Sequence, residues 1–164
     1  MGRRFESCRE RHIRIMIVSV TGTDAGLGKS IADYLEHAHT VLRFGKQHDL
    51  RDYSVRQTIL TADFDVLISV AKPDFAQTQL VYECFEIHGT KKRVINIGSA
   101  VVYEKHWGDD VHMMRYHTQK QSLAHAVAQI NHPNIAIVNP AHLYDPGEYD
   151  YAKLEQWCRN NIVI

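Results

Sequence analysis

The stretch TGTDAGLGKS, from Thr21 to Ser30, decides how the rest of the chain is interpreted. An apolar run precedes it and a helical pattern follows it. Its three glycines, Gly22, Gly26 and Gly28, let the backbone turn tightly and approach a pyrophosphate without a Cβ atom in the way. A helix that starts at such a turn directs free N–H groups and its positive dipole end at the phosphate. The stretch therefore predicts a phosphate-binding turn between a buried strand and a helix.

Composition indicates one globular domain. The chain has 164 residues, of which 45% are hydrophobic and 23% charged, and its formal net charge is zero. This balance favours neither a nucleic-acid nor a membrane partner, and no apolar run is long enough to span a bilayer. The three cysteines are few, odd in number and widely spaced, so they predict a reducing cytoplasm without disulfides. The eleven histidines show no metal-binding spacing, so no metal site is expected.

The first twelve residues, MGRRFESCRERH, differ from the rest because they are basic, polar and aperiodic. They predict a disordered leader, with residues 13–164 as the single domain. A basic arm that binds nucleic acid is the alternative interpretation of this segment. A separate hypothesis is that the natural chain starts at Met16.

Apolar runs typical of buried parallel strands alternate with helical patterns along the domain. Strands are predicted at Ile13–Val20, His39–Phe44, Asp65–Val70, Arg93–Ile97 and Ile135–Asn139, with short ones at His48–Leu50 and Asn161–Ile164. Helices are predicted at Leu27–His37, Ser54–Thr61, Phe75–His88, Val111–Asn131 and Tyr149–Arg159. This alternation predicts an α/β fold of the Rossmann type, a doubly wound parallel sheet with helices on both faces. Ligands of such folds bind at the carboxyl ends of the strands.

Two functional interpretations of the glycine turn are open from the stretch alone. TGTDAGLG resembles the TGxxxGxG turn of a dinucleotide fold. GTDAGLGKS resembles the variant Walker A loop of dethiobiotin synthetase, in which Lys29 would reach a phosphate and Ser30 would bind magnesium. A P-loop enzyme also needs an acid after a buried strand to hold magnesium. The predicted strand ends, Val70-Ala71-Lys72, Gly98-Ser99 and Asn139-Pro140, supply none.

The other strand ends and the fourth predicted helix favour a reductase. Tyr116 and Lys120 form a YxxxK pair, which places a phenol and an ammonium on the same helix face. A nearby cation stabilises a phenolate, so proton transfer near neutral pH becomes feasible. Ser99 ends the strand segment INIGS, where its hydroxyl could hydrogen-bond a substrate carbonyl.

Together these motifs resemble the short-chain dehydrogenase/reductase family, and most of all its abbreviated forms in phages and marine microbes. The resemblance spans roughly residues 15–145 and includes TGxxxGxG, INIGS, YxxxK and Asn139-Pro140-Ala141. It implies hydride transfer between a nicotinamide cofactor and a small carbonyl or alcohol substrate. In these roles Tyr116 would be the general acid/base, Lys120 would hold the nicotinamide ribose, and Ser99 would polarise the carbonyl.

The resemblance also implies the residues that contact the cofactor. Gly22, Gly26 and Gly28 would form the pyrophosphate turn. Asp49 would accept a hydrogen bond from the adenine amino group, and Leu50 would pack beside the ring. His142 and Leu143 would line the nicotinamide. The remaining implied positions are Thr21, Thr23, Ala25, Leu27, Ser69, Val70, Ala71, Pro140 and Ala141.

Charge after the second strand indicates which cofactor is used. Sites that prefer NAD place an acid there to bind the ribose hydroxyls. Here the segment reads Arg43-Phe44-Gly45-Lys46-Gln47, without an acid. Lys46 and Arg43, together with Lys29, could neutralise a 2′-phosphate, so NADP(H) is expected rather than NAD(H). The alternative is that these are ordinary surface cations.

Departures from the family pattern leave a second function open. The segment SVAK at 69–72 lacks the asparagines of the family's NNAG, and Pro140 is followed by Ala141 instead of glycine. A non-catalytic protein that binds NADP(H) for regulation is therefore the main alternative, and a P-loop ATPase or ligase is the third. The short segment after Pro140 predicts a pocket that is open, partly built by a partner subunit, or poorly selective. Family resemblance predicts a homodimer or homotetramer through Phe75–His88 and Val111–Asn131.

Overall fold

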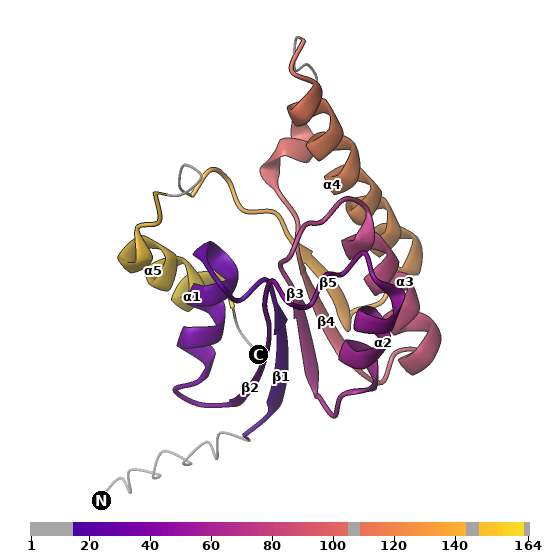
Figure 1. The fold of residues 1–164 in the computed structure, drawn as a ribbon, viewed down its shortest axis with the longest axis vertical. Helices are drawn as coiled ribbons and strands as arrows, with labels where there is room; N and C mark the ends of the chain where they lie inside the picture. The colour runs from indigo at the N-terminus through magenta and orange to yellow at the C-terminus, as the bar shows by residue number, and fades with distance from the viewer. Residues whose placement is uncertain (1–14, 105–108, 144–147, 163–164) are drawn as a thin grey trace, which may run out of the picture.

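The computed structural model describes residues 15–104, 109–143 and 148–162. Its centre is a sheet of five parallel strands in the order β2-β1-β3-β4-β5 (Figure 1). The strands are β1 (Ile17–Thr21), β2 (Thr40–Phe44), β3 (Val66–Ser69), β4 (Arg93–Ile97) and β5 (Ile135–Val138).

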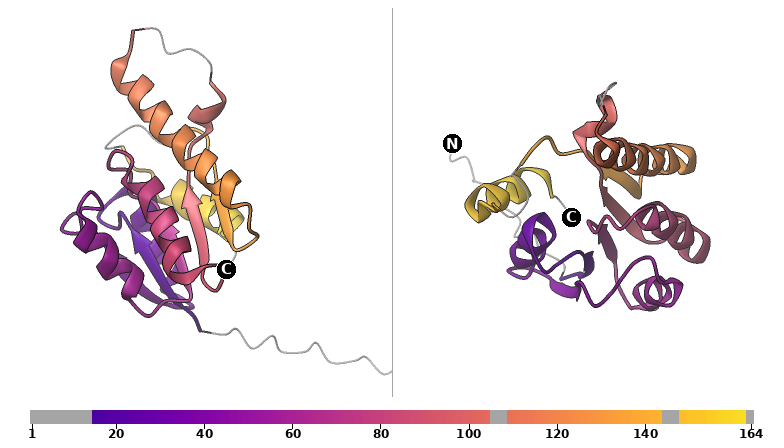
Figure 2. Two further views of the ribbon diagram at one scale, coloured as in Figure 1. Left: turned by 90° about the vertical axis from the view of Figure 1, so that its right-hand side faces the viewer. Right: turned by 45° about the horizontal axis from the view of Figure 1, so that its top comes forward.

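Helices cover both faces of this sheet. They are α1 (Gly26–Leu35), α2 (Tyr53–Thr61), α3 (Ala76–His88), α4 (Val111–Ile130) and α5 (Tyr151–Asn161), with a short 3-10 helix η1 (Ala100–Tyr103). The helices α1 and α5 lie together on one face, and α2, α3 and α4 lie on the other (Figures 1 and 2). The predicted Rossmann-type, doubly wound α/β fold is confirmed.

Strand alternation explains why both faces are buried. In β3, Val66 and Ile68 pack toward α1 and α5, whereas Leu67 between them packs toward α2, α3 and α4. Successive side chains of a strand point to opposite faces, so a strand that is covered on both sides must be apolar throughout. All four residues of β3 are buried.

The strand order creates a crevice at one edge of the sheet. From β1 the chain enters α1 on one face, and from β3 it enters α3 on the other. Such a switch in direction between neighbouring strands opens a crevice at their carboxyl ends, where ligands bind. The glycine turn follows β1 and residues 70–72 follow β3, so the two segments meet there. The first half of α4 extends past the same edge (Figure 2).

Two predicted short strands are wrong. Residues 48–50 join two turns, in which the His48 N–H donates to the Gly45 carbonyl and the Asp52 N–H donates to the Asp49 carbonyl, each at 2.9 Å, and Leu50 is buried in the core. Asn161 is the last residue of α5 and Ile162 caps that helix, while residues 163–164 lie outside the described chain. The expected leader, residues 1–12, also lies outside it. No helix within the described ranges has the length and apolarity of a membrane span.

Candidate active site

The glycine turn adopts a backbone geometry that residues with a Cβ atom would disrupt. Gly22 has a φ of +74°, and its N–H donates to the Phe44 carbonyl at 2.7 Å. A Cβ atom on Gly28 would clash with the carbonyl oxygen of Gly22, so the first turn of α1 rests directly on the loop. The N-cap residue Ala25 makes no side-chain capping bond, and the first turn of α1 holds no acid. The positive end of α1 is therefore available to an anion.

Thr21 ties this turn to the end of β3. Its hydroxyl accepts from the backbone N–H groups of Val70 at 2.9 Å and Ala71 at 3.1 Å, and the side chain is buried. Thr21 thus supports the turn from behind. The segment after β3 is fixed against the glycine turn as a result.

A cavity of about 1000 Å³ runs along the carboxyl edge of the sheet. It joins the glycine turn at one end to the three predicted catalytic residues, Ser99, Tyr116 and Lys120, at the other. The predicted cofactor residues on its wall are Gly22, Ala25, Leu27, Gly28, Val70, Ala71, Pro140, Ala141, His142 and Leu143. The predicted residues away from its wall are Thr21, Thr23, Gly26, Arg43, Lys46, Asp49, Leu50 and Ser69.

Ser99 is held at the end of β4 by two contacts. Its N–H donates to the side-chain oxygen of Asn139 at 3.1 Å. Its hydroxyl accepts from the Val101 N–H at 3.3 Å, as the N-cap of η1. Accepting in this way leaves the Ser99 hydroxyl proton free to be donated. The side-chain amide of Asn139 also donates to the hydroxyl of Tyr103 at 3.1 Å.

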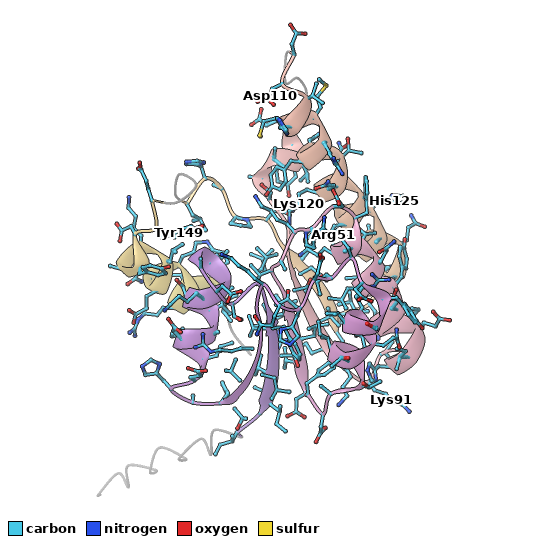
Figure 3. The ribbon with its side chains drawn as sticks, viewed as in Figure 1. Arg51, Lys91, Asp110, Lys120, His125 and Tyr149 are labelled. Carbon is cyan, nitrogen blue, oxygen red and sulfur yellow. The ribbon has the colours of Figure 1, made fainter. Side chains whose placement is uncertain are left out.

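Lys120 lies in a closed polar network beneath the cavity. Its ammonium donates to the side-chain oxygen of Gln77 at 2.8 Å and to the Ile97 carbonyl at 2.9 Å, and only 3% of the residue is exposed. Gln77 in turn donates to the carbonyls of Ser69 at 2.7 Å and Ile97 at 3.0 Å. Burial, and next the nearby charge of Lys72, lower the pKa of Lys120 to about 7. Figure 3 shows Lys120 between α4 and the strand ends.

Tyr116 lies beside two lysines. The Lys120 nitrogen is 5.8 Å from the centre of the Tyr116 ring, as expected for a pair four residues apart on α4. The Lys72 nitrogen is nearer, at 4.7 Å, and comes from the segment after β3. Both distances suit a cation–π contact. The positive charge beside the phenol therefore has two sources.

The cations predicted to select NADP(H) have different surroundings. Arg43 is bound by the carboxylates of Glu36, at 2.7 Å, and Asp33, at 2.6 Å, on α1. The hydrogen bond with Glu36 raises the pKa of Arg43 above its usual value. Lys46 is exposed, and no carboxylate of the described chain pairs with its ammonium. Its backbone N–H donates to the carboxylate of Asp24, an acid of the glycine turn.

The two groups that a P-loop would use are engaged elsewhere. The Lys29 ammonium pairs with Asp33 and lies 5.2 Å from the centre of the Tyr151 ring, on the side of α5. The Ser30 hydroxyl is buried and donates to the Gly26 carbonyl at 3.1 Å. Neither side chain lines the cavity.

The predicted adenine contacts are apart from the cavity wall as well. Asp49 is bound by Arg51 at 2.6 Å, and this hydrogen bond lowers the pKa of Asp49 to about 2. Leu50 is 1% exposed and belongs to the core beneath α2 and α3. In the described part of the chain, no group of three or more His, Cys, Asp or Glu residues could hold a metal ion.

Comparison with solved structures identifies the architecture. A short-chain dehydrogenase/reductase from Vibrio parahaemolyticus has a TM-score of 0.62 at 8% identity, with 90% of this chain and 93% of that chain covered. This chain has the short-chain dehydrogenase/reductase fold. A variant of the actinorhodin polyketide ketoreductase solved with NADPH has a TM-score of 0.60 at 16% identity, over 92% of this chain and 78% of that one. Pseudomonas aeruginosa RhlG, solved with NADP, has a TM-score of 0.55 at 16% identity, over 89% and 76%.

Sequence comparison adds no relative. No protein-family model matches the chain, and no curated protein matches it. The short-chain dehydrogenase/reductase fold therefore rests on structure alone.

Three residues with clear roles in the site were not among the predicted site residues. Gln77 bridges α3, β3 and β4 beneath Lys120, Asn139 orients the Ser99 backbone, and Lys72 contacts the Tyr116 ring. Lys72 directly follows the predicted cofactor segment 69–71, and Asn139 directly precedes Pro140, so their positions pointed to the site. The residues that Gln77, Asn139 and Lys72 contact lie on other helices and strands. Sequence patterns do not predict which of these elements are in contact.

Proposed function

We propose that this protein is an NADP(H)-dependent oxidoreductase of the short-chain dehydrogenase/reductase type, acting on a small carbonyl or alcohol substrate. The observation that carries the proposal is one continuous cavity. At one end stands the uncapped start of α1 on the glycine turn, and at the other stand Ser99, Tyr116 and Lys120. A phosphate-binding end and a proton-transfer end in one cavity fit a dinucleotide whose reactive ring meets a substrate.

The residues present fit the cofactor. Gly22, Gly28 and the N–H groups of α1 would bind the diphosphate, because the missing side chains leave the backbone open and the first turn of α1 holds no acid; the carboxylate of Asp24, in the glycine turn, is bound by the Lys46 N–H. Lys120 uses two of its three N–H donors within the protein, and the third would hold the nicotinamide ribose. Lys46, which has no carboxylate partner in the described chain, would face the 2′-phosphate. Solved neighbours of the same fold carry NADPH or NADP.

The reduction would need one hydride and one proton. NADPH, when bound, would supply the hydride for the carbonyl carbon. The Ser99 hydroxyl donates a hydrogen bond that polarises the carbonyl oxygen, and the Tyr116 phenol transfers its proton to that oxygen. Products are the alcohol and NADP⁺, and the phenolate regains a proton from solvent. Lys72 and Lys120 stabilise the phenolate between these steps.

Replacing the proposed acid tests this function. Tyr116→Phe should keep NADPH binding and lower turnover of any reduced substrate at least about 100-fold, because general acid catalysis is lost. A panel of small aldehydes, ketones and oxo acids, followed by NADPH absorbance, supplies the substrate. Tyr53→Phe is the matched control, since Tyr53 is exposed on α2. NADPH binding without turnover on the whole panel would favour the regulatory protein. Full activity of Tyr116→Phe would refute the assignment of Tyr116.

We also infer that two copies associate through α3 and α4. Exposed apolar side chains on these helices include Tyr82, Phe85 and Ile87 on α3 and Met114 on α4. Their burial between copies would remove apolar surface from water. Sedimentation of the protein should give a dimer or tetramer, and Phe85→Glu should shift it toward monomer.

A further inference from the structure

Lys72 places an exposed cation at the reactive end of the cavity. It leaves the segment after β3, lines the cavity, is exposed, and brings its nitrogen to 4.7 Å from the centre of the Tyr116 ring. Lys120 approaches the same ring but is buried and already hydrogen-bonded to Gln77 and Ile97. Lys72 is thus the lysine of this pair that can turn toward a ligand.

Within the described residues, no carboxylate neutralises the charge of Lys72. No carboxylate in the described ranges lies within ion-pair distance of its nitrogen. The acid two positions along, Asp74, is instead paired with Arg115 and lies 3.9 Å from Arg51. Glu104 contributes a carboxylate to the cavity wall but does not pair with Lys72. An uncompensated cation on a cavity wall favours an anionic ligand.

The position of this cation limits where the anion can be. A carboxylate bound by Lys72 would lie next to the Tyr116 ring, whose phenol would protonate the carbonyl. The anionic group and the carbonyl must therefore be close together in the same small molecule. The diphosphate-binding end of the cavity is formed by the glycine turn and α1, whereas Lys72 follows β3 and contacts the ring of Tyr116 on α4.

We propose that Lys72 binds the carboxylate of the substrate, and that the substrate is a small oxo acid or the corresponding hydroxy acid. This rests on the proposed function, because it assigns the substrate class of the same site. It uses a residue of the segment SVAK, in which the family's NNAG pattern is absent. At the position where this chain departs from the family pattern, Lys72 thus supplies the group that binds the substrate.

A pair of unreactive isosteres tests the proposal. Oxamate carries a carboxylate beside a carbonyl, and oxamide replaces that carboxylate with a neutral amide. The NADPH-loaded protein is titrated with each, and binding is followed by NADPH fluorescence. Oxamate should bind about tenfold more tightly than oxamide, the low end for a hydrogen bond to a charged group.

Variants assign the preference to Lys72. Lys72→Met should bind oxamate and oxamide equally, and Lys72→Arg should keep the preference for oxamate. Lys91→Met is the control, because Lys91 is an exposed lysine at the opposite end of the molecule (Figure 3). It should behave as the wild type. Equal binding of the two isosteres by the wild type, or an oxamate preference that survives in Lys72→Met, would overturn the proposal.

Two further readouts separate this proposal from the proposed function. A loss of NADPH affinity in Lys72→Met, with an unchanged oxamate preference, would assign the lysine to a cofactor phosphate and overturn the proposal. If NADPH does not bind at all, the same two titrations are followed by NMR on the protein alone. An oxamate preference that depends on Lys72 would then support the anion site while the oxidoreductase proposal fails.

Discussion

Lys120 is buried among neutral acceptors, so its charge should make the stability of the folded protein depend on pH. Burial, followed by the charge of Lys72, lowers the pKa of Lys120 from an ordinary value of 10.5 to about 7. In the unfolded chain the ammonium regains its ordinary value. Between about pH 7 and 10.5 the unfolded chain therefore binds more protons than the folded one. The free energy of unfolding rises with pH across this window, and the contribution is lost as the pH falls toward 7.

The size of the effect follows from these two values. Within the window, each pH unit changes the free energy of unfolding by at most about 1.4 kcal/mol. At pH 7 the folded protein is already half deprotonated at Lys120, so the gain from pH 7.0 to 8.5 is about 1.6 kcal/mol. The buried thiols oppose this, because burial raises the pKa of Cys84 to about 11 and that of Cys158 to about 12. The opposing effect of the thiols on the free energy of unfolding grows as the pH rises past the ordinary pKa of a thiol.

Urea unfolding of the wild type and of Lys120→Met, at pH 7.0 and 8.5, measures the effect. The thiols are common to both proteins, so the difference between the two pH responses isolates Lys120. Lys120→Met removes the donor to the Gln77 side-chain oxygen and one of two donors to the Ile97 carbonyl, which keeps the hydrogen bond from Gln77, and that loss is the same at both pH values. We expect the wild type to gain about 1.6 kcal/mol more than the variant. Equal responses, or a smaller gain in the wild type, would refute the buried and weakly basic state of Lys120.

Three substitutions test other parts of the site. Gly28→Ala should lower the free energy of unfolding by about 2 kcal/mol in urea unfolding, because its Cβ meets the Gly22 carbonyl; wild-type stability would contradict that contact. Lys46→Met should weaken NADPH binding about tenfold in a fluorescence titration and leave NADH unchanged, and an equal loss for both would exclude a 2′-phosphate contact. Arg43→Met should lower stability by about 0.5 kcal/mol and keep the NADPH-to-NADH ratio of affinities, since its partners are Glu36 and Asp33; a changed ratio would return Arg43 to the cofactor site.

The central strands β1, β3 and β4 could be predicted because they are mostly apolar and buried on both faces of the sheet. The run Arg93–Ile97 was predicted with the bounds that the structure shows. The convergence of Ser99, Tyr116 and the glycine turn followed from one rule, that carboxyl ends of parallel strands share an edge. The turn at 48–50 was missed because the apolar side chain of Leu50 serves the core beneath α2 and α3, not a sheet.

The partners of the charged residues could not be predicted in the same way. Arg43 was expected to face a phosphate, but the docking of α1 beside β2 brings Glu36 and Asp33 to its guanidinium. Lys120 was expected at an open ribose site, yet Gln77 and the end of β4 enclose two of its three donors. Such pairings depend on how helices pack on the sheet, which local periodicity does not encode.

The central claim is that the glycine turn opens a dinucleotide cavity that ends at Tyr116. Parallel titration of the protein with NADPH, NADH and Mg-ATP tests it most directly. NADPH should bind more tightly than NADH, and Mg-ATP should bind weakly, since the Lys29 ammonium and the Ser30 hydroxyl are engaged away from the cavity. Tight binding of Mg-ATP without binding of NADPH would contradict the claim of a dinucleotide cavity. It would favour the interpretation of the glycine turn as a P-loop.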